Sequence, residues 1–263
     1  MSSEVTQTLI TGMHRSGTTL VGDLFGVHPD VHHVFHESVL MNLTRDQLFS
    51  AKTLPDHRML QTRGELSRAR NVEACEWVVD CDLASHSFGA KMSYPGPLLL
   101  QEWQDRTTAY VRRWLECLGA SARVVHVIRH PFDVFISARR RWQGDPGHIA
   151  NYGPVTLEAI CRDWVHAVEG VEALLEDDPR ALTVRYETLL ESPEKVLAEI
   201  YLQSGLDRPE EMAHEALAGD VVFFGKVDAS RAFPHRRESL EAISRSTGFL
   251  LRDPFQRFGY DAA

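Results

Sequence analysis

The segment Gly12–Thr19, with the sequence GMHRSGTT, has the residue types of an anion-binding loop. Glycines at positions 12 and 17 allow the unusual backbone angles of a tight loop and leave room for an anion close to the main chain. Successive backbone N–H groups can then point inward, and the dipole of a following helix adds to their attraction for negative charge. The hydroxyls of Thr18 and Thr19 can contribute as well. We therefore predict an anion site here; the alternative is a strand-to-helix turn that binds nothing.

This pattern is close to the phosphate-binding loop of nucleoside-triphosphate enzymes, G-x-x-x-x-G-K-[ST], with one difference. The lysine is absent, and a cation stands instead at Arg15, before Ser16 and Gly17. Kinases and NTPases use that lysine on the β- and γ-phosphates and a hydroxyl on Mg²⁺. The missing lysine therefore argues against a P-loop kinase or NTPase but does not exclude one.

A second basic segment follows the run VVHVI at residues 124–128, which has the clearest strand pattern in the chain. Arg129 comes directly after this run, and Ser137 is close enough in the following helix or loop to reach the same phosphate group. Ligands in parallel α/β folds bind at the carboxyl ends of the strands, where Arg129 would lie. The alternative is an Arg129 paired with an acidic neighbour and a solvated run of arginines at 139–141.

The elements that must position these residues alternate between strands and helices. Short apolar runs predict the strands, and longer stretches with helical spacing of apolar residues predict the helices. Such alternation is typical of a parallel sheet covered by helices on both faces. We expect strands over residues 7–11, 31–35, 87–92, 124–128 and 181–185, and helices from residue 17 and over residues 101–118, 132–142, 156–176 and 193–205.

The overall composition limits the possible classes of protein. The 263 residues are 43% hydrophobic and 25% charged, which suits one globular domain. A net charge of −9 argues against nucleic-acid binding. No apolar run has the length of a transmembrane helix, and the first residues lack the pattern of a secretory signal. We therefore expect a cytoplasmic protein with no membrane span and no nucleic-acid partner.

A metal site is considered for the histidine-rich stretch HPDVHHVFHES. His32 and His36 are four residues apart and Glu37 follows, so a helix would place them together. The apolar residues between them fit a strand better, and the four cysteines have no zinc-type spacing. We predict no metal site.

Taken together, the two basic segments resemble those of sulfotransferases that use 3′-phosphoadenosine 5′-phosphosulfate (PAPS). GMHRSGTTL is similar to the 5′-phosphosulfate loop of that family, and VIRHPFDVFISARR is similar to its 3′-phosphate motif. Weaker similarities lie in FGAKMSYP, in the Tyr-Glu unit VRYETLLESPEKVLAEIYLQSGL and in the C-terminal LLRDPFQRFGY. Bacterial and tyrosyl-protein members often have arginine at the position of Arg15, where cytosolic members have lysine. The chain thus looks like the bacterial and tyrosyl-protein branch.

The resemblance implies a fold and a set of ligand contacts. The fold would be α/β, with a P-loop NTPase-like central parallel β-sheet flanked by helices on both faces, in a single sulfotransferase domain over residues 1–263. The 5′-phosphosulfate would lie on the first loop, the 3′-phosphate on Arg129 and Ser137, and the adenine near Tyr186. The late R-K-G triplet of cytosolic members is missing, and Arg231 is one of four basic residues in the comparable region. The residues implied in donor binding are Arg15, Ser16, Gly17, Thr18, Thr19, Arg129, Ser137, Tyr186 and Arg231.

The resemblance further implies in-line transfer of a sulfuryl group from PAPS to a hydroxyl, or less often an amine, of a small-molecule, lipid or glycan acceptor. Arg15 and the loop N–H groups would offset charge on the transferring group. Sulfuryl carries less charge than phosphoryl, so no metal is expected to be required. The acceptor needs a general base. Glu37 is the first candidate and His36 the second, because related enzymes carry a catalytic glutamate or histidine in this region. A nucleotide-binding module without catalysis is the remaining alternative.

Overall fold

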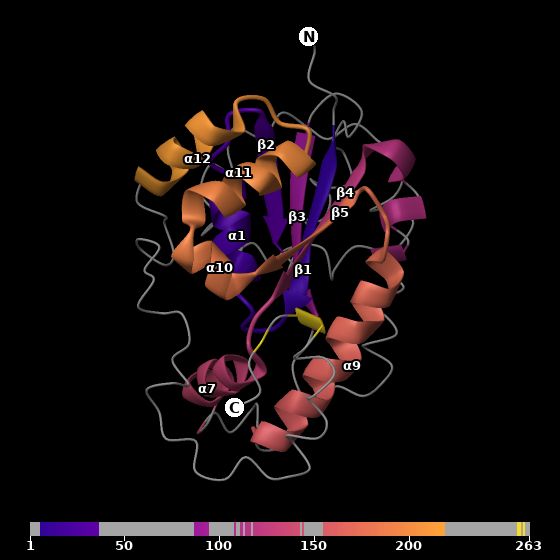
Figure 1. Cartoon of the computed structure of the whole chain (residues 1–263), viewed down its shortest axis with the longest axis vertical. Coiled ribbons are helices and arrows are strands. Elements are labelled where there is room, and N and C mark those ends of the chain that lie inside the picture. The colour runs from indigo at the N-terminus through magenta and orange to yellow at the C-terminus, as the bar shows by residue number, and fades with distance from the viewer. Residues whose placement is uncertain are drawn as a thin grey trace, which may run out of the picture.

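The structure is a computed structural model of the chain. It describes residues 6–36, 87–94, 108, 111–112, 114–116, 118–142, 144, 155–218, 257–258 and 260. Its centre is a five-stranded sheet in the order β2-β3-β1-β4-β5, and every neighbouring pair of strands is parallel. Figure 1 shows the strands running side by side through the middle of the molecule. Their bounds are β1 Gln7–Met13, β2 Val31–His36, β3 Ser87–Tyr94, β4 Ala122–Ile128 and β5 Ala181–Arg185.

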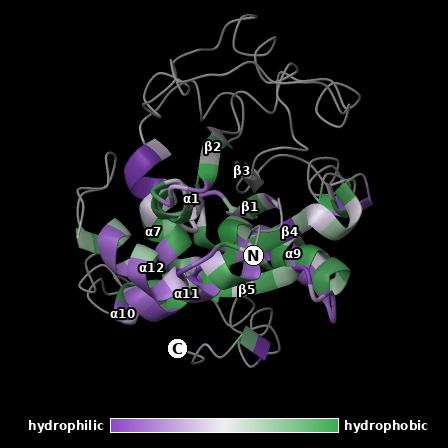
Figure 2. Ribbon diagram, turned by 90° about the horizontal axis from the view of Figure 1, so that it is seen from above, coloured by the Kyte–Doolittle hydropathy of each residue, from purple (hydrophilic) through white to green (hydrophobic). Residues whose placement is uncertain are grey.

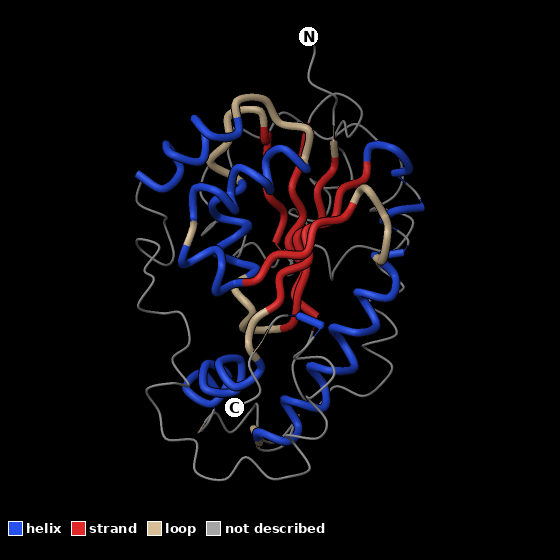
Figure 3. Tube along the Cα trace, viewed as in Figure 1, coloured by secondary structure: helices blue, strands red, loops and turns tan. Residues whose placement is uncertain are grey.

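The register places the carboxyl ends of the central strands at one edge of the sheet. Gly12, near the end of β1, pairs with Val127 of β4. Ile128, the last residue of β4, pairs with Arg185, the last residue of β5. The loops that follow β1 and β4 therefore leave the sheet at the same edge, the lower one in Figures 1 and 3.

Helices cover both faces of this sheet, as the alternation in the sequence predicts. Viewed along the strands in Figure 2, α1, α10, α11 and α12 lie to one side and α9 to the other, with hydrophobic residues concentrated in the strands between them. Parallel sheets need such cover because both of their faces are apolar. The helices are α1 Thr18–Phe25, α7 Pro131–Trp142, α9 Leu157–Leu175, α10 Tyr186–Glu191, α11 Pro193–Gln203 and α12 Pro209–Ala218.

Two hydrophobic cores follow from this arrangement. On one face, Ile10 and Val127 of the sheet pack with Leu24 of α1 and residues of α10, α11 and α12. On the other face, Leu9 and Ile128 pack with α7, α9 and the C-terminal aromatic residues. Alternate residues of β1 and β4 thus belong to different cores, as the two-residue period of a strand requires.

The secondary structure agrees closely with the sequence predictions. The strand over 181–185 is confirmed at both ends, and the other four are confirmed and longer by one to two residues at one end. Thr156 caps α9 by accepting a hydrogen bond from the Ala159 N–H, and Pro193 occupies the first turn of α11, where its missing N–H costs nothing. The described residues of the expected 101–118 helix are helical.

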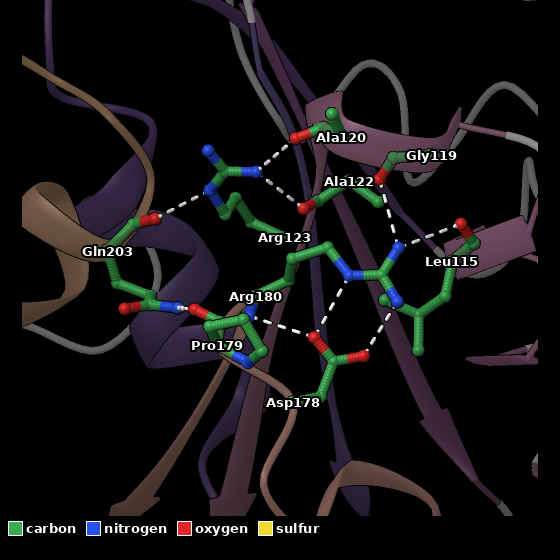
Figure 4. Close-up of polar contacts among 9 residues, drawn as sticks. All are labelled: Leu115, Gly119, Ala120, Ala122, Arg123, Asp178, Pro179, Arg180 and Gln203. Atoms are coloured by element: carbon green, nitrogen blue, oxygen red, sulfur yellow. Dashed lines mark hydrogen bonds and ion pairs between the residues drawn. The ribbon is translucent and has the colours of Figure 1, made fainter.

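A polar clamp holds the opposite edge of the sheet, where β4 and β5 begin (Figure 4). Arg180 donates hydrogen bonds to the carbonyl oxygens of Leu115 (3.1 Å) and Gly119 (3.0 Å). Its guanidinium also pairs with Asp178, with Nη2 2.6 Å from Oδ2 and Nε 2.9 Å from Oδ1. Nearby, Arg123 Nε donates to the Gln203 carbonyl at 3.0 Å. Arginine side chains thus donate to backbone carbonyl groups in the turns that precede β4 and follow α11.

Candidate active site

The loop that joins β1 to α1, residues 14–17, is built from unusual backbone conformations. Arg15 has a φ of 71° and Gly17 a φ of 98°, both in the left-handed region. The Ser16 N–H donates to the Met13 carbonyl at 3.0 Å, and Gly17 caps α1. Residues other than glycine rarely adopt a positive φ. The positive φ of Arg15 therefore indicates a constrained loop, of the kind found at functional positions. The tight turn expected from the sequence is confirmed, and we call it the β1–α1 loop.

The two glycines of this segment serve different purposes. Gly17 supplies the positive φ that the sequence predicts. Gly12 lies within β1, and a Cβ atom there would stand 2.3 Å from the Val127 carbonyl oxygen of β4. Its missing side chain therefore permits a close approach of two strands, and the expectation that Gly12 gives the loop an unusual backbone angle is wrong.

Arg129 lies directly against this loop. Its Nη1 donates to the Arg15 carbonyl oxygen at 3.0 Å, and its guanidinium carbon is 4.4 Å from the centre of the Tyr186 ring. Its own carbonyl accepts a hydrogen bond of 2.8 Å from the Trp164 indole N–H of α9. The two basic segments, predicted separately from the sequence, therefore come together at the carboxyl edge of the sheet.

Ser137 connects the same segments from α7. The Nε of Arg15 donates to the Ser137 hydroxyl oxygen at 3.0 Å. Because Arg129 contacts the backbone of Arg15 and Ser137 contacts its side chain, the three residues form one cluster. Arg15 has a lowered pKa, caused mainly by burial and further by the positive charges of Arg129 and Arg141. Cations held close together in this way favour binding of an anion between them.

Two buried polar groups in this cluster fit a ligand with oxygen acceptors and donors. The Oγ of Ser16 and the Nε of Arg129 are buried and have no hydrogen-bond partner within the described part of the chain. Buried polar groups are normally paired, so a bound group that satisfies them suits this position. The first two residues of α1 add hydroxyls: Thr18 is buried and Thr19 is partly exposed.

Tyr186 forms a wall of the site next to the β1–α1 loop. It is buried at the start of α10, and a Cβ atom at Gly17 would stand 2.3 Å from its Cδ2. The ring therefore packs on Gly17 on one side of the loop and on the Arg129 guanidinium. The structure therefore brings Tyr186 together with both basic segments, while its expected position near the adenine stays a prediction.

A buried carboxylate, which the sequence analysis did not single out, supports the Arg129 segment. Glu187 Oε1 accepts from the His130 N–H at 2.8 Å, and Oε2 accepts from the Tyr260 hydroxyl at 3.0 Å. Burial raises the pKa of Glu187, while the His130 N–H and the charge of Arg129 act in the opposite direction. The sequence feature that could have identified Glu187 is its position, directly after Tyr186 and beyond the carboxyl end of a predicted strand. No comparable sequence feature identifies Tyr260.

The remaining predicted site residues fall outside what the structure describes. Glu37 and Arg231 lie beyond the described residues. The backbone of His36 ends β2, but its side chain is not described. Within the described ranges, no group of three or more histidine, cysteine, aspartate or glutamate residues is arranged to hold a metal ion.

Comparison with known proteins decides the family. Residues 8–210 match the family model described as the sulfotransferase family. The chain belongs to the sulfotransferase family. The match includes the β1–α1 loop, Arg129, Ser137 and Glu187, so the cluster described above lies within the family's common region. The prediction of a sulfotransferase is thus confirmed over the kinase and the non-catalytic alternatives.

Solved structures share the fold of this sulfotransferase. A sulfotransferase domain from the curacin biosynthetic pathway has a TM-score of 0.67 at 16% identity, covering 100% of both chains. The sulfotransferase domain of the Synechococcus PCC 7002 olefin synthase has a TM-score of 0.59 at 20% identity, covering 99% of this chain and 97% of that chain. Retinol dehydratase, solved with retinol and 3′-phosphoadenosine 5′-phosphate (PAP), has a TM-score of 0.52 at 15% identity. The match covers 95% of this chain and 81% of that chain. The predicted α/β fold is confirmed.

The curated proteins contain no match to this sulfotransferase. Among the helices that the structure describes, none combines the length and apolar character needed to cross a membrane.

Proposed function

We propose that this sulfotransferase uses PAPS as its donor and releases PAP, with the β1–α1 loop and the Arg129 segment as the donor site. The observation that carries the proposal is the convergence of Arg15, Arg129 and Ser137, linked by hydrogen bonds of 3.0 Å at the carboxyl edge of the sheet. PAPS carries two anionic groups on one nucleoside, and this site has two adjacent basic segments to receive them.

The β1–α1 loop would hold the 5′-phosphosulfate. Its backbone N–H groups precede a helix N-terminus, which attracts negative charge. Arg15, whose lowered pKa reflects burial and neighbouring cations, would offset charge on the transferring sulfuryl group and the leaving phosphate. Fixed donors of this kind need no reorganisation during the reaction. The other loop contacts would come from Ser16, Gly17, Thr18 and Thr19.

Arg129 and Ser137 would hold the 3′-phosphate. Arginine presents a planar fork of donors that suits phosphate oxygens, and the stack on Tyr186 fixes the plane of the guanidinium. Because Ser137 also accepts from Arg15, it lies between the proposed 5′ and 3′ contacts. Tyr186 would then lie near the adenine, and Arg231 stays a proposed contact from outside the described residues.

Glu37 is the proposed general base, and His36 the alternative. The proposal is supported by position: β2 ends at His36, and its partner β3 is the neighbour of β1 in the sheet. Because these strands are parallel, β2 ends at the edge of the sheet at which Arg15 lies. A base must come within hydrogen-bond distance of the acceptor hydroxyl to take its proton.

The acceptor is proposed to be a hydroxyl, or less often an amine, of a small-molecule, lipid or glycan compound. That the reaction needs no metal, that residues 1–263 form a single sulfotransferase domain and that the protein acts in the cytoplasm stay predictions. The family's sulfuryl chemistry supports the first, because the transferring group carries less charge than a phosphoryl group.

Calorimetric titration with PAP, and separately with ATP and Mg²⁺, tests the donor assignment. We expect micromolar binding of PAP without metal and much weaker binding of ATP. Arg129→Ala should weaken PAP binding by about 100-fold while changing the affinity for adenosine 5′-phosphosulfate, which lacks the 3′-phosphate, far less. Equal weakening of both ligands, or tight metal-dependent ATP binding with no response to PAP, would overturn the proposal.

Replacement of the proposed base is tested on the same protein once an acceptor is found. Glu37→Gln should abolish turnover and leave the PAP affinity within about twofold, because the amide keeps the shape of the side chain but accepts no proton. Retained turnover would transfer the role to His36.

A further inference from the structure

Tyr260, near the C-terminus, is linked to the segment that carries Arg129 through a single buried carboxylate. Glu187 accepts from the Tyr260 hydroxyl at 3.0 Å and from the His130 N–H at 2.8 Å. Glu187 is 1% exposed, and Tyr260 is 5% exposed, so water competes little for these bonds. One carboxylate therefore joins residues that are far apart in the sequence to the backbone directly after Arg129.

Aromatic contacts fix Tyr260 in this position independently of its hydroxyl. Its ring centre lies 5.1 Å from that of His130, and the Arg185 guanidinium carbon lies 4.4 Å from the ring. Trp164 packs against Tyr260 at 6.2 Å and donates its indole N–H to the Arg129 carbonyl. The ring provides packing, while the hydroxyl donates to Glu187 and also interacts with the Arg185 side chain.

The peptide group that joins Arg129 to His130 is thus held at both of its polar atoms. The Arg129 carbonyl is fixed by Trp164, and the following N–H, of His130, is fixed by Glu187. A side chain of arginine length converts a small backbone rotation into a large displacement of its guanidinium. Two restraints beside its Cα atom therefore determine where that guanidinium can lie, which matters because binding groups must be held within about half an ångström.

We propose that Glu187 and Tyr260 are positioning residues for the 3′-phosphate site: they hold the Arg129–His130 backbone so that the Arg129 guanidinium meets the 3′-phosphate. This inference rests on the proposed function, since it assigns to Arg129 the 3′-phosphate of the donor. The C-terminal end of the chain thereby determines affinity for one phosphate group of the nucleotide.

Removal of the Tyr260 hydroxyl alone is the first test. Tyr260→Phe keeps the ring contacts and removes the hydroxyl, with its bond to Glu187 and its interaction with Arg185, so PAP binding should weaken by about five- to tenfold. Binding of 5′-AMP, which lacks the 3′-phosphate, should change less than about twofold, because the β1–α1 loop is untouched. Tyr201→Phe is the matched control: Tyr201 is fully buried, and its hydroxyl donates to the Leu24 carbonyl at 2.6 Å in the other core.

Two variants of Glu187 separate position from packing. Glu187→Gln keeps an oxygen that can accept the His130 N–H, and it should retain PAP binding within about threefold. Glu187→Ala removes the acceptor, and it should lose at least about tenfold in PAP affinity with little change in 5′-AMP affinity. Thermal unfolding of each variant confirms that the protein measured is folded.

A double-variant cycle tests whether Tyr260 affects PAP affinity through Arg129. In an Arg129→Ala background, adding Tyr260→Phe should change PAP affinity by less than about twofold, because the group being positioned is gone. A full additional loss in that background, or equal weakening of PAP and 5′-AMP in Tyr260→Phe, would overturn the inference while leaving the donor assignment intact. Wild-type protein that binds PAP no better than 5′-AMP would instead overturn the proposed donor site, and the inference with it.

Discussion

Arg15 and Ser137, which are 122 positions apart in the sequence, are joined by a 3.0 Å hydrogen bond between the guanidinium Nε and the hydroxyl oxygen. The bond links the β1–α1 loop to the second turn of α7. It also fixes an arginine whose backbone is in the left-handed region. The proposed contacts for the 5′ and 3′ groups of the donor are thus continuous, and we expect a change at Ser137 to affect both.

Ser137→Ala should therefore weaken PAP binding by about tenfold, because it removes the proposed contact with the 3′-phosphate and the acceptor that orients Arg15. Binding of 5′-AMP should weaken by a smaller factor, about threefold, through Arg15 alone. Calorimetric titration of both ligands measures the two effects. The matched control is Ser121→Ala, since the Ser121 hydroxyl donates to the Leu118 carbonyl at 2.7 Å, away from the loop. Unchanged PAP affinity in Ser137→Ala would show that the hydroxyl contributes to neither contact.

Gly17→Ala should destabilise the protein for two separable reasons. The φ of 98° is strained for any L side chain, and the new methyl would stand 2.3 Å from the Tyr186 ring. Gly119→Ala is the matched control, because Gly119 has a φ of 56° but nothing within 4 Å of its Cβ position. We expect a loss of about 1 kcal/mol in the free energy of unfolding for Gly119→Ala, and about 2 kcal/mol more for Gly17→Ala.

Denaturant unfolding of both glycine variants measures these losses. Equal losses would mean that the loop and Tyr186 move apart freely. PAP affinity further distinguishes the two variants. It should fall only in Gly17→Ala, since Gly119 lies at the opposite edge of the sheet from the β1–α1 loop.

The central strand β4 could be predicted because it is buried on both faces, and such strands appear in the sequence as nearly continuous apolar runs. The edge strand β5 is only partly buried, yet its apolar run was predicted to the residue. The end of β1 was placed too early because Gly12 looked like a stop signal. Its role depends on the Val127 carbonyl of a strand more than a hundred residues later, which no local pattern contains.

The candidate site was predictable where local chemistry and strand ends coincide. Arg15 and Arg129 each follow a predicted strand, so parallel topology places both at one edge. The contact between Glu187 and Tyr260 spans 73 positions, and it depends on how α10 and the C-terminal residues pack. Only tertiary structure specifies such a pair.

Cys161 should be inert in the folded protein. It is fully buried in α9, and burial raises the pKa of its thiol to about 12. The reactive thiolate is therefore scarce at pH 8 and inaccessible to reagents. Iodoacetamide labelling followed by peptide mass spectrometry should find Cys161 unmodified in the native protein and fully modified in denaturant. Rapid labelling of the native protein would contradict the packing of α9 against the sheet.

Acid should weaken the clamp formed by Asp178 and Arg180 (Figure 4). Hydrogen bonds from the Arg180 side chain are the main reason that the pKa of Asp178 is lowered. A carboxyl whose folded pKa lies below its unfolded value of about 3.9 adds stability above that value and loses it as the pH falls through the folded pKa.

Asp178→Asn should therefore lower the melting temperature at pH 6, with a loss of about 1–2 kcal/mol in the free energy of unfolding. The difference from wild type should shrink below about pH 4, where the wild-type carboxyl also begins to take up a proton. The neighbouring exposed Asp177 supplies the control variant Asp177→Asn, which should leave the curve of melting temperature against pH nearly unchanged. A deficit in Asp178→Asn that stays constant down to pH 2 would mean that shape, rather than charge, accounts for the role of Asp178. In that case the Arg180 bonds to the Leu115 and Gly119 carbonyls would hold this edge of the sheet by themselves.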